Sequence, residues 1–142
     1  MMPGHARHYP SFLSYPCRVP FEVTLSAWFS AAHQLRLEDG ALEPLHGHNW
    51  RVRLVVARED GGLDAIGTVH DFHDLQRRLD AVLKGFHNTH LNELPAFGGG
   101  KLNPTTENVA FHIATSLRLP AGLEVTTVEV WETPDCSATW RK

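Results

Sequence analysis

Hydrophobic and polar residues alternate along four segments of the chain, which predicts four β-strands. The first two segments span residues 21–33 and 49–59, and a long acidic loop joins them. The third runs over residues 123–132 and the fourth over residues 137–141, with Pro134-Asp135 as the turn between them. In each strand alternate side chains point to the same face, so each segment is expected to bury one face.

Between the second and third segments, the spacing of hydrophobic residues becomes helical. Asp71 is a predicted N-cap, and the apolar residues after it fall on one side of a helix. A second helix is expected to begin within residues 103–107, where hydroxyls and a carboxylate suit a helix start, and to stop at Pro120. The glycines at 98–100 predict a mobile loop between the helices. The predicted order is strand, strand, helix, helix, strand, strand.

Three histidines lie in phase with the apolar sides of the first two strands. His46 and His48 are two residues apart in the segment that runs directly into the second strand, so their rings are expected to project to the same face. His33 ends the first alternating segment, again on its apolar side. If the two strands pair, the three imidazoles converge, and three neutral nitrogens with one open position hold a catalytic zinc. The alternative for His46 and His48 is a turn with two solvated rings.

Composition limits the class of protein. The chain has 142 residues, a formal net charge of −3 and two cysteines. One domain is expected over residues 21–142, after a flexible N-terminal extension at residues 1–20. The scattered basic residues give no nucleic-acid footprint, and no apolar segment reaches membrane-spanning length. Two cysteines cannot form a disulfide framework, which favours a cytoplasmic location. Together with the charge and the hydropathy, this predicts a protein without nucleic-acid or membrane partners.

Glu132 ends the third predicted strand on the same side as apolar residues. A carboxylate at the rim of an apolar face can accept two hydrogen bonds from a planar, guanidine-like heterocycle. A solvated glutamate at a strand end explains the same position. Glu107 also has two explanations: it can contact a ligand, or it can simply belong to a helix start, where a carboxylate is favoured without any ligand.

Several short motifs occur in one order between residues 29 and 133. They read FSAAH at 29–33, LHGHNW at 45–50, GTVHDF at 67–72, LN at 91–92, PTTEN at 104–108 and ET at 132–133. In this order and spacing the chain resembles the 6-pyruvoyltetrahydropterin synthase / 6-carboxytetrahydropterin synthase family over nearly all of residues 21–142.

The resemblance implies both a fold and a site. The fold would be the α+β tunnelling fold, with an antiparallel four-stranded sheet and two helices packed on one face. Its subunits would assemble into an oligomeric barrel, as a trimer-based oligomer, a tetramer or a hexamer. The site would hold zinc on the three histidines and a pterin ring on Glu132, with Glu107 and the Thr105-Thr106 backbone nearby.

The chain departs from the family pattern at two catalytic positions. The cysteine usual before the His-Gly-His motif is absent, and one branch of the family uses a glutamate there, which makes Glu43 the candidate and Glu38 the second. The family's Asp-His pair is replaced by His87-Asn88. Asparagine cannot shuttle a proton, whereas His87 can, although it lacks an aspartate partner. His87 and His90 can also be loop histidines without a catalytic role.

The predicted function is a zinc-dependent pterin enzyme. It would act on 7,8-dihydroneopterin triphosphate or a related pterin by elimination or carbon–carbon cleavage, and cleavage depends least on a cysteine. The alternative is a non-catalytic or functionally diverged protein that binds a pterin or a purine-like ligand and retains the zinc. A purely structural zinc site is disfavoured, because no fourth protein ligand stands at a typical spacing.

Overall fold

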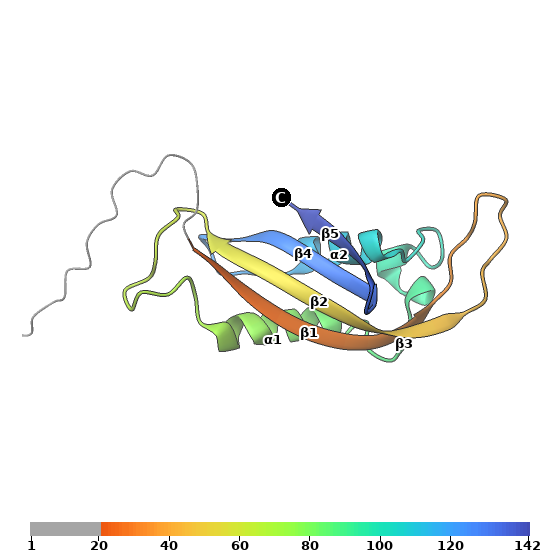
Figure 1. Cartoon of the computed structure of the whole chain (residues 1–142), viewed down its shortest axis with the longest axis horizontal. Coiled ribbons are helices and arrows are strands. Elements are labelled where there is room, and N and C mark those ends of the chain that lie inside the picture. The colour runs from red at the N-terminus through yellow and green to blue at the C-terminus, as the bar shows by residue number, and fades with distance from the viewer. Residues whose placement is uncertain (1–20) are drawn as a thin grey trace, which may run out of the picture.

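The computed structural model describes residues 21–142, and the predicted N-terminal extension, with Cys17, lies outside the described residues. Most of the predicted elements are present, with a further short strand between the helices (Figure 1). In chain order they are β1 (Glu22–His33), β2 (His46–Arg58), α1 (Phe72–Leu83), β3 (Thr89–His90), α2 (Thr106–Ser116), β4 (Leu123–Thr133) and β5 (Cys136–Arg141). Two short 3-10 helices, Leu91–Glu93 and Pro95–Phe97, follow β3.

The strands form one five-stranded sheet in the order β3-β1-β2-β4-β5. The pairs β1–β2, β2–β4 and β4–β5 are antiparallel, whereas β3 runs parallel to β1. The expectation of a wholly antiparallel, four-stranded sheet is therefore wrong at one edge. A strand of two residues carries no alternation that a sequence pattern can show.

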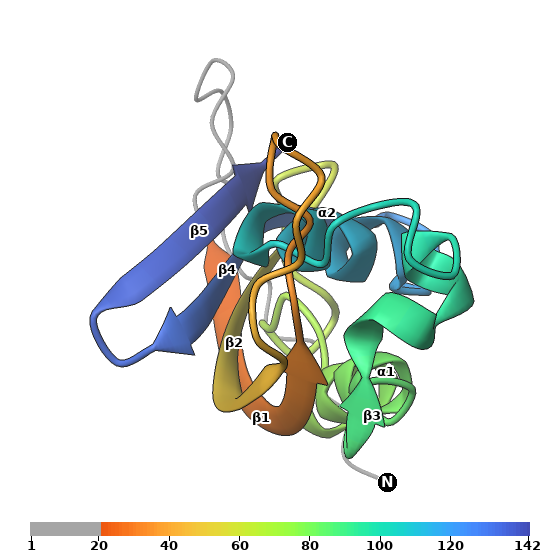
Figure 2. The ribbon, with the colours of Figure 1, turned by 90° about the vertical axis from the view of Figure 1, so that its right-hand side faces the viewer.

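Both helices cover the same face of the sheet, as Figure 2 shows. The inner face of the sheet supplies the buried residues Leu25, Ala27, Phe29 and Ala31 from β1 and Trp50, Val52, Leu54 and Val56 from β2. Against them pack Leu75, Leu79 and Leu83 of α1 and Val109, Ala110 and Ile113 of α2. Each such large apolar side chain contributes about 1.5–3 kcal/mol when fully buried. The core thus confirms the spacings predicted for β1, β2 and the two helices, except that Phe72, expected on the apolar side of the first helix, is 56% exposed.

A β-bulge in β4 decides which way Glu132 points. The pairing with β2 shifts between Val55, opposite Thr127, and Val56, opposite Val125, so Thr126 is the extra residue. In a regular strand Val125 and Val128 would point to opposite faces, because they are three residues apart. The extra residue between them places both side chains on the buried face. Beyond the bulge, Val128 and Val130 face the core, and Glu132 follows them on the same side of the strand.

The helix starts are those that the sequence predicts. The Asp71 side chain accepts a hydrogen bond from the His73 N–H at 2.8 Å, which caps α1. The Thr105 hydroxyl accepts from the Asn108 N–H at 3.2 Å, which caps α2 and fixes Thr106 as its first residue. This cap matters for the site, because Thr106 contacts Glu132.

Among the helices of residues 21–142, none combines the length and the apolar character that a membrane crossing requires. The cytoplasmic location stays a prediction.

Candidate metal centre

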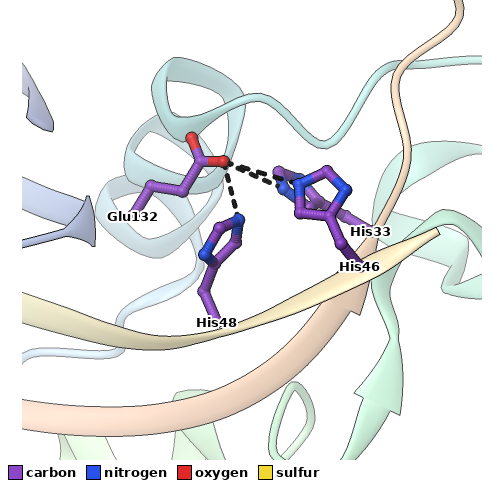
Figure 3. Close-up of side chains that lie close together, drawn as sticks. All are labelled: His33, His46, His48 and Glu132. Atoms are coloured by element: carbon purple, nitrogen blue, oxygen red, sulfur yellow. Dashed lines mark hydrogen bonds and ion pairs between the residues drawn. The ribbon is translucent and has the colours of Figure 1, made fainter. Parts of the chain in front are cut away.

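His33, His46 and His48 meet at one end of the inner face of the sheet (Figure 3). His33 is the last residue of β1 and pairs directly with His46, the first residue of β2, and His48 lies two residues farther on. The centroids of the three rings are 4.7, 4.8 and 5.2 Å apart. The predicted convergence of the three imidazoles is confirmed.

Backbone carbonyls hold two of the rings by their outer nitrogens. His33 Nδ1 lies 2.9 Å from the carbonyl oxygen of Pro104, and His46 Nδ1 lies 2.8 Å from that of Pro44. A carbonyl oxygen only accepts, so in each ring Nδ1 carries a proton, and Nε2 is the nitrogen that faces the centre. This is the arrangement found around metal-bound histidines, in which the outer N–H fixes the orientation of the ring.

Glu132 brings a carboxylate to the point where the rings converge. Its Oε1 lies 2.9 Å from His48 Nε2, 3.1 Å from His33 Nε2 and 3.9 Å from His46 Nε2. Its Oε2 accepts a hydrogen bond from the Thr106 hydroxyl at 2.9 Å. One ligand atom from each of the four residues lies within 4.8 Å of the others, so the group could hold a metal ion.

The electrostatics of this group suit a cation. Burial lowers the pKa of His48, which favours the neutral ring that a metal requires. Burial alone would raise the pKa of Glu132, but the Thr106 hydrogen bond and the charge of His33 outweigh it, so the pKa lies below its usual value. His48 Nε2 is buried and makes no hydrogen bond, although Glu132 Oε1 is close. A buried imidazole lone pair without a hydrogen-bond partner is a donor suited to a metal.

Two expectations about Glu132 change with this geometry. It is not a solvated strand-end residue, because its carboxylate contacts the imidazoles and Thr106. It is also a fourth donor residue, which the spacing along the sequence did not reveal because it lies on β4, far from His48 in the chain. The signal that could have found it was its phase with Val128 and Val130.

Glu43 lies at the edge of the centre, whereas Glu38 does not contact it. Glu43 Oε1 accepts a hydrogen bond from the Leu35 N–H at 2.9 Å and lies 4.0 Å from His46 Nε2. Glu38 is exposed in the loop between β1 and β2. Of the two candidates, the fold therefore brings Glu43 to the histidines.

His87 is placed at the edge of the sheet, outside the group of four. Its Nδ1 accepts a hydrogen bond from the Ser30 N–H at 3.1 Å, and the next residue, Asn88, donates its N–H to the Ser30 oxygen at 2.6 Å. Asn88 has a φ of 57°, a left-handed conformation that asparagine tolerates. His90 Nδ1 lies 3.4 Å from Glu93, and its Nε2 is buried without a hydrogen bond. Within one chain, neither ring reaches the three histidines.

The other candidate residues lie at the start of α2 and after β4. Thr106 contacts Glu132, Thr105 caps the helix, and Glu107 is exposed in its first turn. A helix start is a sufficient explanation for Glu107. Cys136 is a free, exposed thiol in β5.

Comparisons with known proteins agree with this fold. Residues 22–142 match the model of the family described as 6-pyruvoyl tetrahydropterin synthase. The chain is 34% identical to the dihydroneopterin monophosphate aldolase of Pyrococcus furiosus, over 78% of this chain and 88% of that protein. It is also 34% identical to the putative 6-carboxy-5,6,7,8-tetrahydropterin synthase of Archaeoglobus fulgidus, over 80% and 89% of the two chains. The 6-pyruvoyl tetrahydropterin synthase of Caenorhabditis elegans superimposes with a TM-score of 0.65 at 25% identity, over 86% of this chain and 95% of its own. The chain belongs to the 6-pyruvoyl tetrahydropterin synthase family.

Proposed function

We propose that the protein is a zinc-dependent enzyme that acts on 7,8-dihydroneopterin triphosphate or a related pterin by elimination or carbon–carbon cleavage. The observation that carries this proposal is the convergence of three imidazoles with fixed outer nitrogens on one carboxylate. The names of the relatives support pterin chemistry, and one of them is named as an aldolase. That name, together with a glutamate at position 43, favours cleavage.

The donor set fits zinc. Imidazole nitrogen and carboxylate oxygen are donors that zinc accepts, and three histidines with one further position form a typical catalytic site. Zinc bound there would act as a Lewis acid and lower the pKa of substrate hydroxyls. The remaining work falls to side chains of the protein.

Glu132 is proposed to hold the pterin ring. Its carboxylate can accept two parallel N–H bonds from the 2-amino-4-oxo edge of a pterin, as it would from a guanidinium. The Thr106 hydroxyl already holds one oxygen of this carboxylate, which limits its rotation. Thr105 and Glu107, at the same helix start, are proposed to line the pterin site.

Glu43 and His87 are proposed to move protons. The Leu35 N–H holds one oxygen of Glu43 beside His46, which leaves the other oxygen to accept a proton. His87 uses Nδ1 to accept from Ser30, so the proton on its exposed side belongs to Nε2. These roles predict that Glu43→Gln and His87→Ala each reduce turnover of 7,8-dihydroneopterin triphosphate by roughly 100-fold or more.

The measurement is steady-state turnover together with zinc content, which should stay unchanged in both variants. Glu38→Gln serves as the matched control, because it removes an exposed carboxylate from the same loop. If Glu43→Gln and His87→Ala turn over the substrate like the parent, these two residues do not replace the family's acid and base.

A second candidate function follows from the fourth donor. A zinc ion with four protein ligands is typical of structural sites, and Glu132 completes such a set. A diverged protein that binds a pterin or a purine-like ligand and keeps the zinc would have this closed site. Measuring turnover and binding of dihydroneopterin triphosphate on the same preparation separates the two, since this second candidate predicts binding without turnover.

We also propose that the chain forms a homo-oligomer. On the helix-free face of the sheet, Trp28 is 65% exposed, and Arg51 lies between it and Trp131, with its guanidinium carbon 5.9 and 4.8 Å from the two ring centroids. In residues 21–142, the outer edge of β5 has no strand partner, and an open edge is a site of pairing with another chain. Light scattering after gel filtration should give the mass of a trimer-based oligomer, a tetramer or a hexamer, and a monomeric mass would contradict this proposal.

A further inference from the structure

The chain leaves the sheet directly after His33. The pairing of β1 ends there, at His33 opposite His46 on one side and Ala32 opposite His90 on the other. The backbone polar groups of the next three residues, 34–36, are nevertheless all bonded, and side chains supply most of their partners. Ordered backbone at this point matters because it fixes the end of the strand that carries His33.

Asn92 extends the sheet by one residue. The Gln34 N–H donates to Asn92 Oδ1 at 3.0 Å, and Asn92 Nδ2 donates to the Gln34 oxygen at 2.7 Å. A carboxamide offers the same donor and acceptor as a peptide group, so it can take the place of a strand neighbour. Asn92 stands in the short helix after β3, on the outer side of β1 in the strand order.

Asn103 binds the backbone two residues farther on in the same way. The Arg36 N–H donates to Asn103 Oδ1 at 2.8 Å, and Asn103 Nδ2 donates to the Arg36 oxygen at 2.9 Å. Between these two amide pairs, the Leu35 N–H donates to the Glu43 carboxylate. Three polar side chains from three separate segments therefore hold three consecutive residues.

Asn103 also connects this segment to the ring of His33. The carbonyl oxygen of the next residue, Pro104, is the one that lies 2.9 Å from His33 Nδ1. The carbonyl oxygen of Asn103 itself accepts from Asn108 Nδ2 at 2.8 Å, which ties it to α2. A shift of Asn103 would thus move both the chain after His33 and the carbonyl that orients its ring.

We propose that Asn92 and Asn103 are positioning residues of the metal centre, an inference that rests on the proposed metal function. They do not contact the Nε2 atoms that converge on Glu132. They hold the two residues on either side of Leu35, directly after His33, and Asn103 also fixes the start of the segment whose Pro104 carbonyl orients the His33 ring. Outer contacts of this kind set the affinity of a site for its metal by fixing the ligands in advance.

The variants that test this are Asn92→Asp and Asn103→Asp. Each keeps the acceptor oxygen and replaces the Nδ2 donor with a second oxygen, which then faces a carbonyl oxygen at the former hydrogen-bond distance. Asn49→Asp is the matched control, because Asn49 Oδ1 accepts from the Ser30 hydroxyl at 2.6 Å and aspartate still accepts there. Asn103→Ala, which removes both bonds without repulsion, serves if Asn103→Asp does not fold.

Zinc affinity, measured by competition with a chelator, is expected to fall about 10–100-fold in both aspartate variants and to stay at the parent value in Asn49→Asp. The visible spectrum of the cobalt-substituted protein should change with it. In the metal-free protein, the ¹⁵N resonances of His33 should move in Asn103→Asp, because Nδ1 loses its fixed carbonyl partner.

Unchanged zinc affinity, cobalt spectrum and His33 resonances in these variants overturn the inference, even if their melting temperatures fall. If the parent binds no zinc but Asn103→Asp still moves the His33 resonances, positioning of His33 stands and the proposed function fails.

Discussion

Replacing His48 or His46 with alanine is expected to remove most of the zinc from the purified protein. The parent should carry about one zinc per chain, held by three imidazoles. Either substitution deletes one of the three converging nitrogens and leaves two imidazoles beside Glu132, a set too weak to keep the ion through dialysis. The fold should be partly retained, since the buried Trp50, Val52 and Leu54 still form the core beside the site.

Metal analysis by mass spectrometry after dialysis gives the zinc content, and circular dichroism reports whether the sheet persists. His73→Ala is the matched control, because His73 is exposed on α1 and belongs to no group of potential metal ligands among residues 21–142. If His48→Ala or His46→Ala keeps one zinc per chain, the metal is held elsewhere and the assignment to these histidines is wrong.

The histidine centre could be predicted from the sequence because strand geometry alone determines it. A period of two fixes which side chains share a face, and pairing of the first two strands then brings their ends together. His33, His46 and His48 needed no further information than their phase with the apolar residues. The two helices could also be predicted from the sequence, since their spacing and caps are local features of the chain.

Other features depend on contacts between segments far apart in the chain. The bulge at Thr126 changes the phase of β4 midway, so alternation counted from Leu123 puts Glu132 on the wrong face, and only its phase with Val128 and Val130 places it correctly. The strand β3 exists only because β1 offers it an edge. The amide pairs of Asn92 and Asn103 join side chains to distant backbone, for which no periodic pattern exists.

Glu132 carries the second large expected effect, because its carboxylate serves either the pterin or the metal. As a pterin anchor it makes two charge-assisted hydrogen bonds, and Glu132→Gln should cost on the order of 2–4 kcal/mol in pterin binding. That cost corresponds to a loss of affinity of about 30- to 1000-fold. The direct measurement is titration of the parent and the variant with sepiapterin or biopterin.

Zinc affinity, measured on the same two proteins, distinguishes the two roles of Glu132. If the carboxylate anchors the pterin, zinc affinity should change little, because the imidazoles of His33, His46 and His48 still hold the ion. If it is a fourth ligand, zinc affinity should fall, because an amide is a weaker ligand than a carboxylate.

Thr106→Val, which removes the hydroxyl that holds Glu132 Oε2, should also weaken pterin binding, but less than Glu132→Gln does, since the carboxylate itself remains. Equal pterin affinities for the parent and Glu132→Gln would mean that the chain has kept the family's metal site without its pterin site.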